Sequence, residues 1–191
     1  MCSSDLALAI GPGCGRDDAT ALQVRATVGA APVPVVIDGD GLFAMAWGGD
    51  DALGVLRRRS LPTVITPHDG EFELLTGTVP GSDRLAAARR LAAAASCTVL
   101  LKGPCTVVAA PDGEALLVAD GDERLATAGT GDVLTGVVAA MLARGLDGPR
   151  AAASGAFLLA AAAARCGRNG TIASDVVAGL PAVLDDLDAA R

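Results

Sequence analysis

The sequence predicts a three-layer α/β fold in which helices cover both faces of a mostly parallel central sheet. Two observations predict this fold. Short apolar runs rich in valine, isoleucine and leucine alternate with longer, alanine-rich stretches along the 191 residues. Turns rich in glycine and acidic residues follow the apolar runs, as they do where strands end. No linker or repeat interrupts this order, so we expect residues 6–191 to form a single domain.

The predicted elements follow in order along the chain. Strands are expected at residues 6–10, 33–37, 63–66 and 97–103, and a hairpin with a Pro-Asp-Gly turn at 105–120. Helices are expected at residues 17–30, from near residue 71, and at 82–96, 130–144, 149–165 and 172–187. Ser82 or Asp83 is the expected cap of the helix at 82–96. Parallel strands end at one edge of a sheet, so we expect the glycine- and acid-rich turns to gather along one rim, where ligands bind.

Composition excludes several classes of function. Acidic residues outnumber basic ones 22 to 15, so the chain has no general attraction for nucleic acid or an anionic membrane. No apolar run is long enough to span a bilayer. The five scattered cysteines and the single histidine exclude a Cys/His zinc cluster. We expect reduced, mostly buried thiols in a cytoplasmic protein.

The first five residues do not fit the rest of the pattern. "CSSDL" is also what a common sequencing adaptor encodes in one frame, and the apolar stretch after it resembles a strand from the middle of a sheet. Residues 1–5 are therefore expected to be a cloning or assembly scar, with the natural chain continuing upstream. No signal-peptide pattern is present in this segment.

The segment "ATAGTGDVLTG" carries the clearest chemical signal. Its glycines let the backbone approach a ligand, and the helix that follows adds unpaired N–H groups and a partial positive charge. This combination predicts an anion hole for a phosphoryl group, with Asp132 as a base that accepts a proton from an attacking hydroxyl. Taken alone, the segment also fits an ordinary glycine turn with an acid at a helix start.

Four other segments each allow two interpretations. Lys102, at a strand end, fits either a nucleotide phosphate or solvent. His68, with Asp69 and acids nearby, fits a substrate oxygen or a helix-start turn. Asp38 and Asp40 would hold Mg²⁺ through water or cap the next turn. The "GPGCG" turn either lets a ligand approach the backbone closely or only ends the strand before it. The arginines at 57–59 are expected to be a solvated cluster.

The ordered set of motifs resembles one family over residues 6–187. "GPGCGRD", "VIDGDGL", "TPHDGEFELLTG", "LLKGPCTVV" and "ATAGTGDVLTGVVAAMLARG" occur in that order. The series is similar to the ADP/ATP-dependent NAD(P)H-hydrate dehydratases of the ribokinase-like superfamily. The resemblance implies a ribokinase-like fold that is incomplete at the N-terminus, since family members usually begin with about two more strand–helix units, and bacterial members are often fused to an epimerase domain.

The resemblance also implies a reaction. Family members phosphorylate the C6 hydroxyl of hydrated NADH or NADPH from ADP or ATP, with Mg²⁺, and eliminate phosphate to restore the dihydronicotinamide. For this chain the resemblance favours ADP. It also implies a homo-oligomer that works beside an NAD(P)HX epimerase.

Site residues are carried over by matching motifs. Asp132 matches the catalytic base, and it also contacts substrate. The anion hole is Gly129, Thr130 and Gly131. The nucleotide-binding residues are Lys102, Gly103, Pro104, Cys105, Thr106 and Gly131. The substrate-contacting residues are Gly15, Pro67, His68, Gly70 and Glu71. Asp38 and Asp40 match acids near the phosphates.

Two alternatives remain from the sequence. A hydroxymethylpyrimidine or hydroxyethylthiazole kinase would share the G-T-G-D element, but it would be expected to carry asparagine after the Thr-Pro turn where His68 stands. An inactive fragment that only binds nucleotide is the other, because part of the family's sheet is expected to lie upstream.

Overall fold

The computed structural model describes residues 5–190 of the chain, so the predicted scar at residues 1–5 lies almost wholly outside the described residues. One six-stranded sheet has the order β1-β2-β3-β4-β5-β6. The parallel strands are β1 (Leu8–Ile10), β2 (Val35–Ile37), β3 (Thr63–Ile65) and β4 (Thr98–Leu101). The hairpin of β5 (Thr106–Ala109) and β6 (Ala115–Val118) continues the sheet antiparallel. The predicted mostly parallel α/β sheet is therefore confirmed.

Helices lie on both faces of the sheet. The longer helices are α1 (Asp18–Ala30), α4 (Asp69–Thr76), α5 (Arg84–Ala95), α6 (Thr130–Ala143), α7 (Gly148–Ala164) and α8 (Ala173–Ala189). The short ones are α2 (Asp40–Ala46), α3 (Gly54–Arg57) and the 3₁₀ turns η1 (Gly49–Asp51) and η2 (Glu123–Ala126). Asp83 caps α5, as one of the two predicted candidates. None of the described helices has both the length and the apolar character needed to cross a membrane.

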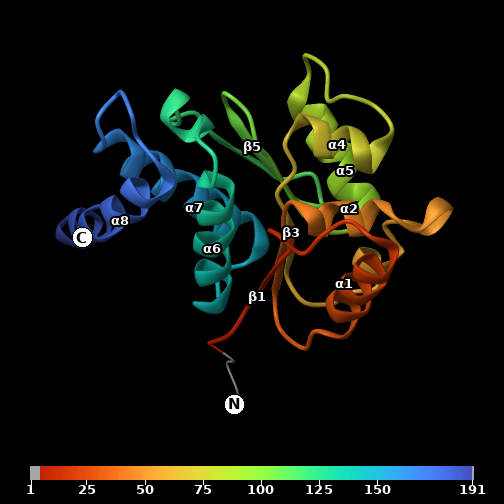
Figure 1. Ribbon diagram of the computed structural model, residues 1–191. Coiled ribbons are helices and arrows are strands. Elements are labelled where there is room, and N and C mark those ends of the chain that lie inside the picture. The colour runs from red at the N-terminus through yellow and green to blue at the C-terminus, as the bar shows by residue number, and fades with distance from the viewer. Residues whose placement is uncertain (1–4, 191) are drawn as a thin grey trace.

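Alternation along the strands divides the core between two layers. Val35 and Ile37 pack in a cluster with α1 to α5, whereas Val36 between them packs in a cluster with α6, α7 and α8. Figure 1 shows the two sets of helices on opposite sides of the sheet, with α8 lying outside α7. Because all three strand residues are fully buried, β2 is a central strand covered on both faces.

The sequence did not predict α2, and the reason is a close packing contact. The glycines around Asp40 were interpreted as a turn, but Gly41 lies within the helix. A Cβ on Gly41 would lie 2.8 Å from Ile37 Cγ2 and 3.0 Å from the Gly11 Cα. Glycine at this position therefore serves the packing of α2 on the loop after β1, and not a turn.

Two smaller predictions were wrong. Among the described cysteines only Cys97 is buried, which raises the pKa of its thiol to about 12, while Cys14 is exposed. Arg59 does not belong to a solvated cluster. Its guanidinium donates to the backbone carbonyls of Val28, Ala31 and Val33, so it ties the end of α1 to the approach to β2.

Candidate active site

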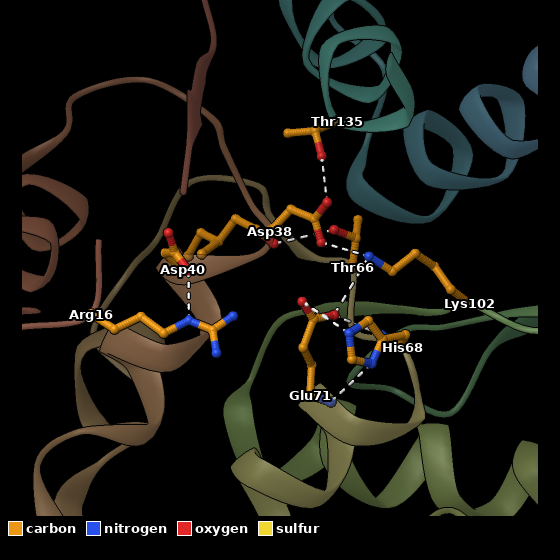
Figure 2. A network of polar contacts seen from close by, with 9 residues as sticks. Arg16, Asp38, Asp40, Thr66, His68, Glu71, Lys102 and Thr135 are labelled. Carbon is orange, nitrogen blue, oxygen red and sulfur yellow. Dashed lines mark hydrogen bonds and ion pairs between the residues drawn. The ribbon is translucent and has the colours of Figure 1, made fainter. Parts of the chain in front are cut away.

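The predicted rim exists at the carboxyl ends of the parallel strands. Its centre is a set of side chains that we call the strand-end network: Asp38, Thr66, His68, Glu71 and Lys102. Asp38 follows β2, Thr66 and His68 follow β3, and Lys102 follows β4. Figure 2 shows these side chains pointing toward one another, with Thr135 of α6 above them. The parallel topology thus brings together residues that are up to 64 positions apart in the chain.

Asp38 is the buried centre of the network. Its side chain is 4% exposed, and its Oδ1 accepts a hydrogen bond of 2.7 Å from Lys102 Nζ. Its Oδ2 lies 3.0 Å from the hydroxyl of Thr135, which also lies 3.0 Å from the Gly131 carbonyl. Both carboxylate oxygens of Asp38 therefore have protein partners, and through Thr135 the residue is connected to the first turn of α6.

Glu71 and His68 form the second half of the network. Glu71 Oε2 accepts from the backbone N–H of His68 at 2.8 Å and lies 3.5 Å from Lys102 Nζ. His68 Nδ1 accepts from the backbone N–H of Glu71 at 3.2 Å, which completes a capping box at the start of α4. A ring nitrogen that accepts carries no proton, so the donor of the ring is Nε2, which lies 3.5 Å from Glu71 Oε1.

The start of α6 is arranged differently. Helices α1, α5 and α7 begin after Asp17, Asp83 and Asp147, whose carboxylates accept a backbone N–H. Helix α6 begins after Gly129, with φ 89°, and no side chain in the part of the chain that the structure describes caps it. Within the described chain, the backbone N–H groups of Gly131 and Asp132 have no acceptor.

Thr130 and Asp132 have opposite surroundings within this first turn. Thr130 is buried, and its hydroxyl lies 2.6 Å from the Leu125 carbonyl and 2.7 Å from the Thr127 carbonyl, so it fixes the loop that enters the helix. Asp132 is exposed, and its side chain makes no hydrogen bond or ion pair with any described residue. Two unpaired N–H groups beside a free carboxylate are what an anion hole with an adjacent base requires.

A cavity of about 870 Å³ lies between the strand-end network and the α6–α7 layer. The predicted residues that line it are His68, Gly70, Lys102, Gly103, Pro104, Thr106, Thr130 and Gly131. Its apolar wall consists of Val118, Leu125, Leu134, Ala156, Leu159 and Ala160. A polar rim facing an apolar wall suits a ligand with a phosphate at one end and a flat ring at the other.

Other predicted residues stand beside the cavity without lining it. Asp132 follows directly after Gly131, which lines it, and a Cβ on Gly131 would lie 3.4 Å from Asp38 Oδ2 and 3.8 Å from Lys102 Nζ. Pro67 accepts from the backbone N–H of Lys102 at 2.9 Å. Glu71 does not line the cavity, but it lies 3.5 Å from Nζ of Lys102, which does. Gly129 and Cys105 are chain neighbours of the lining residues Thr130 and Pro104.

Asp40 and Arg16 lie at the other side of Figure 2, apart from the strand-end network. Asp40 Oδ2 accepts from the backbone N–H of Gly15 at 3.0 Å, and Oδ1 accepts from Arg16 Nε at 2.6 Å. The hydrogen bond from Arg16, followed by that from Gly15, lowers the pKa of Asp40 below its usual value. Asp40 thus holds the glycine turn after β1 onto α2.

Sequence reasoning missed the wall of the cavity. The segment from Gly121 to Ala126 and three α7 residues, Ala156, Leu159 and Ala160, contribute to it. The only signal for the α7 residues was an alanine-rich helix, which predicts burial. Small apolar residues look the same in a sequence whether they pack on a sheet or line a cavity.

Comparison with known proteins identifies the family. The family model described as NAD(P)H-hydrate dehydratase matches residues 3–179. The chain belongs to the NAD(P)H-hydrate dehydratase family.

It is 46% identical over 144 residues to the bifunctional NAD(P)H-hydrate repair enzyme Nnr of Mycobacterium tuberculosis, covering 75% of this chain and 29% of that protein. It is 41% identical over 188 residues to the corresponding Moorella thermoacetica enzyme, covering 95% of this chain and 35% of that protein. The chain therefore spans about a third of the length of these curated relatives.

Solved structures agree with this NAD(P)H-hydrate dehydratase assignment. The ADP/ATP-dependent NAD(P)H-hydrate dehydratase from Bacillus subtilis, co-crystallized with ATP/Mg²⁺, superposes with a TM-score of 0.81 at 31% identity, over 94% of this chain and 64% of that chain. Hydroxyethylthiazole kinase from Pyrococcus horikoshii superposes with a TM-score of 0.67 at 21% identity, over 92% of this chain and 70% of that chain. At that identity the kinase shares only the fold. A ribokinase-like superfamily protein from Enterococcus faecalis also shares the fold, with a TM-score of 0.74 at 24% identity over 94% of this chain and 62% of that chain, which confirms the predicted ribokinase-like architecture.

Proposed function

We propose that this chain carries out the ADP-dependent dehydration of hydrated NADH and NADPH. The observation that supports the proposal is the open start of α6: unpaired N–H groups of Gly131 and Asp132, next to a cavity that Lys102 and His68 also line. Family membership supplies the substrate class. The B. subtilis relative, named ADP/ATP-dependent, supports the choice of a nucleoside phosphate as donor.

The residues divide the reaction between them. Backbone N–H groups of Gly131 and Asp132 stabilise the oxygens of the phosphoryl group during transfer, aided by the partial positive charge at the start of α6. Lys102 and the loop that follows it hold the nucleotide phosphates in the cavity. The oxygen of the C6 hydroxyl bonds to phosphorus while the bond between phosphorus and the leaving nucleotide breaks. Asp132 accepts the proton of that hydroxyl during this step.

Elimination then completes the dehydration. The phosphorylated C6 oxygen leaves as inorganic phosphate, while the lone pair of the ring nitrogen forms a double bond to C6. Loss of a proton from the neighbouring ring carbon restores the dihydronicotinamide. Phosphorylation is needed because hydroxide is a poor leaving group. The exposed side chain of His68 and the Gly15 turn are the chain's proposed contacts to the hydrated dinucleotide.

The residues fit a magnesium ion that arrives with the nucleotide. Among the described residues no group of three or more His, Cys, Asp or Glu side chains could hold a metal, and the oxygens of Asp38 and Asp40 already have protein partners. Mg²⁺ typically binds through phosphates, waters and one or two carboxylates. When bound, it neutralises charge on the phosphates, and Asp38 and Asp40 would reach it only through water.

The proposal also covers the protein's wider setting. It keeps the predicted cytoplasmic location and a homo-oligomeric state, with residues 6–191 acting as one domain. An NAD(P)HX epimerase is the proposed functional partner, and the relatives named bifunctional support that pairing.

Incubating the protein with hydrated NADH, ADP and Mg²⁺ tests the function. Recovery of the near-ultraviolet absorbance of the dihydronicotinamide, dependent on ADP, is the expected result. Phosphate transfer to hydroxyethylthiazole or hydroxymethylpyrimidine without that recovery would replace the proposal with a vitamin kinase. Nucleotide binding without turnover of any of these substrates would identify the chain as an inactive fragment.

A further inference from the structure

Arg84, the first residue of α5, connects two segments that line the cavity. Its Nη1 donates to Asp69 Oδ1 at 2.7 Å, and its Nη2 donates to the backbone carbonyl of Lys102 at 2.6 Å. Asp69 begins α4, and Lys102 directly follows β4; both line the cavity. One planar guanidinium therefore joins the start of α4, the start of α5 and the loop after β4.

Gly103 lies so close to this guanidinium that a side chain at residue 103 would clash with it. A Cβ on Gly103 would lie 2.5 Å from Arg84 Nη2, 2.9 Å from Cζ and 3.2 Å from Nε. The backbone of Gly103 is not in the left-handed region, so its conformation does not require glycine. Glycine at this position instead leaves the room beside the peptide that the Arg84 guanidinium occupies. The side chain has little room to yield, because both Nη atoms are already bonded.

The burial of Arg84 shows how strongly its position is fixed. Its side chain is 20% exposed, whereas Asp69 is 59% exposed. Arg84 Nε is buried and has no hydrogen-bond partner within the described residues. An unpaired buried N–H is costly, so the contacts of the two Nη groups and the packing on Gly103 hold the guanidinium in place despite that cost.

Lys102 is consequently fixed at both ends. Arg84 holds its carbonyl oxygen, while Asp38 and Glu71 hold its ammonium group. Loss of Arg84 would free the Lys102–Gly103 peptide, although the ammonium would keep its partners. The backbone of the loop that faces the nucleotide would then no longer be preorganised.

We propose that Arg84 is a positioning residue of the nucleotide site, acting through the Lys102–Gly103 peptide and Asp69. The proposal rests on the proposed function, since it assumes that ADP occupies the cavity. It assigns Arg84 no contact with the nucleotide. Arg84 sets the affinity for ADP by fixing the loop, and it has no part in proton transfer.

A double-mutant cycle on ADP binding, measured by calorimetry, tests the proposal. Arg84→Ala and Gly103→Ala should each weaken ADP binding by about tenfold or more, because each displaces the guanidinium from the loop. In the double variant the two losses should not multiply, because Arg84→Ala has already removed the guanidinium with which the new methyl group of Gly103→Ala would clash. The kcat at saturating ADP should fall by less than about threefold in Arg84→Ala, since only positioning for binding is lost.

Arg89→Ala is the matched control on the same helix. Arg89 is exposed and donates from Nε to the Gly113 carbonyl in the hairpin turn, away from the cavity. Its loss should leave ADP affinity unchanged, and melting temperatures will show whether each variant is folded. Equal ADP affinities of wild type, Arg84→Ala and Arg89→Ala would overturn the proposal, as would losses that multiply in the double variant.

The same measurements separate this proposal from the proposed function. Wild-type protein that binds ADP but does not dehydrate hydrated NADH would contradict the function, while the cycle would still decide the role of Arg84. Wild-type protein that does not bind ADP would contradict both.

Discussion

The two sides of the cavity differ in how their polar groups are satisfied. On one side, the carboxylate of Asp38 is buried and both its oxygens have partners, and Glu71 and His68 bond to each other. On the other side, Asp132 is exposed with no side-chain partner in the described chain, and the helix start behind it has no cap. The first side is preorganised for holding a ligand, and the second keeps its groups available for reaction.

This difference explains why strand-end acids and a helix-start acid take separate roles. A carboxylate whose oxygens bond to lysine and threonine is held in one position. A carboxylate without partners can gain and lose a proton without breaking protein contacts. The comparison predicts that substitutions on the first side lower stability, whereas substitution of Asp132 lowers only the rate.

The largest expected effect is on turnover. Asp132→Asn should lower the rate of dehydration by about 10²–10⁴-fold, the usual contribution of a positioned base. Its melting temperature should match that of the wild type, because the side chain bonds to nothing that the structure describes. Asp185→Asn, an exposed helical aspartate on α8, is the control and should retain full activity. Near-full activity of Asp132→Asn would contradict the role of Asp132 as the catalytic base.

The tight packing of the strand-end side predicts a large loss of stability at Gly11. A Cβ there would lie 1.8 Å from the Asp38 carbonyl oxygen, and φ is 130°. Gly11→Ala should lower the free energy of unfolding by about 3 kcal/mol, because strain and a backbone clash add.

Gly13→Ala is the matched control in the same turn. Gly13 also has a positive φ, 71°, but a Cβ there would meet no atom of residues 5–190 within 4 Å. It should cost only about 1 kcal/mol, the penalty of the left-handed conformation. Urea denaturation compares the two variants, and equal losses would show that the close approach to Asp38 is not what requires glycine at residue 11.

Two acids two residues apart sharpen the comparison on the strand-end side itself. Asp38→Asn should lower the free energy of unfolding by about 2 kcal/mol, because it leaves the half-buried Lys102 without its main counter-charge. Asp40→Asn should cost less than about 1 kcal/mol, because its partner Arg16 is 63% exposed. Urea denaturation at neutral pH measures both, and the reverse order would contradict the importance assigned to the buried pair.

The smallest effect concerns acid stability at the cavity wall. Hydrogen bonds from the Arg124 side chain and backbone lower the pKa of Asp122 to about 2 in the folded protein. Its unfolded value is near 4, so this pairing stabilises the fold above about pH 4, and the contribution is lost as the pH falls towards 2.

Asp122→Asn tests this contribution. Wild type should be more stable than the variant at neutral pH, and the difference should shrink between about pH 4 and about pH 2. Urea denaturation at several pH values measures the difference. A difference that stays constant across that range would show that the Asp122–Arg124 pairing is not the source.

The sequence predicted the order of the elements because strands and helix starts carry local signals. Asp83 caps α5 and Gly129 precedes α6, and both signals are readable from nearby residues. Helix α2 was missed because Gly41 is needed for close packing against Ile37, and a sequence does not show which residues pack together. Arg59 was interpreted as solvated for the same reason, since its carbonyl partners lie at the end of α1 and in the segment after it, about 30 residues earlier.

The sequence predicted which residues lie around the cavity better than it predicted the contacts between them. Motifs placed Lys102, His68 and Gly131 around one cavity, which the structure contains. They did not show that Asp38 binds Lys102 or that Arg84 holds the following loop. Those contacts depend on how α5 and β4 pack, so tertiary structure was needed to find them.

The most direct test of the division between the two sides measures the ADP dissociation constant and the kcat of Asp132→Asn together. Our account predicts that ADP binds as tightly as to the wild type, or more tightly because a negative charge near the phosphates is gone, while kcat falls at least about a hundredfold. Loss of ADP affinity in parallel with kcat would show that Asp132 holds the nucleotide, and would contradict its role as the free base.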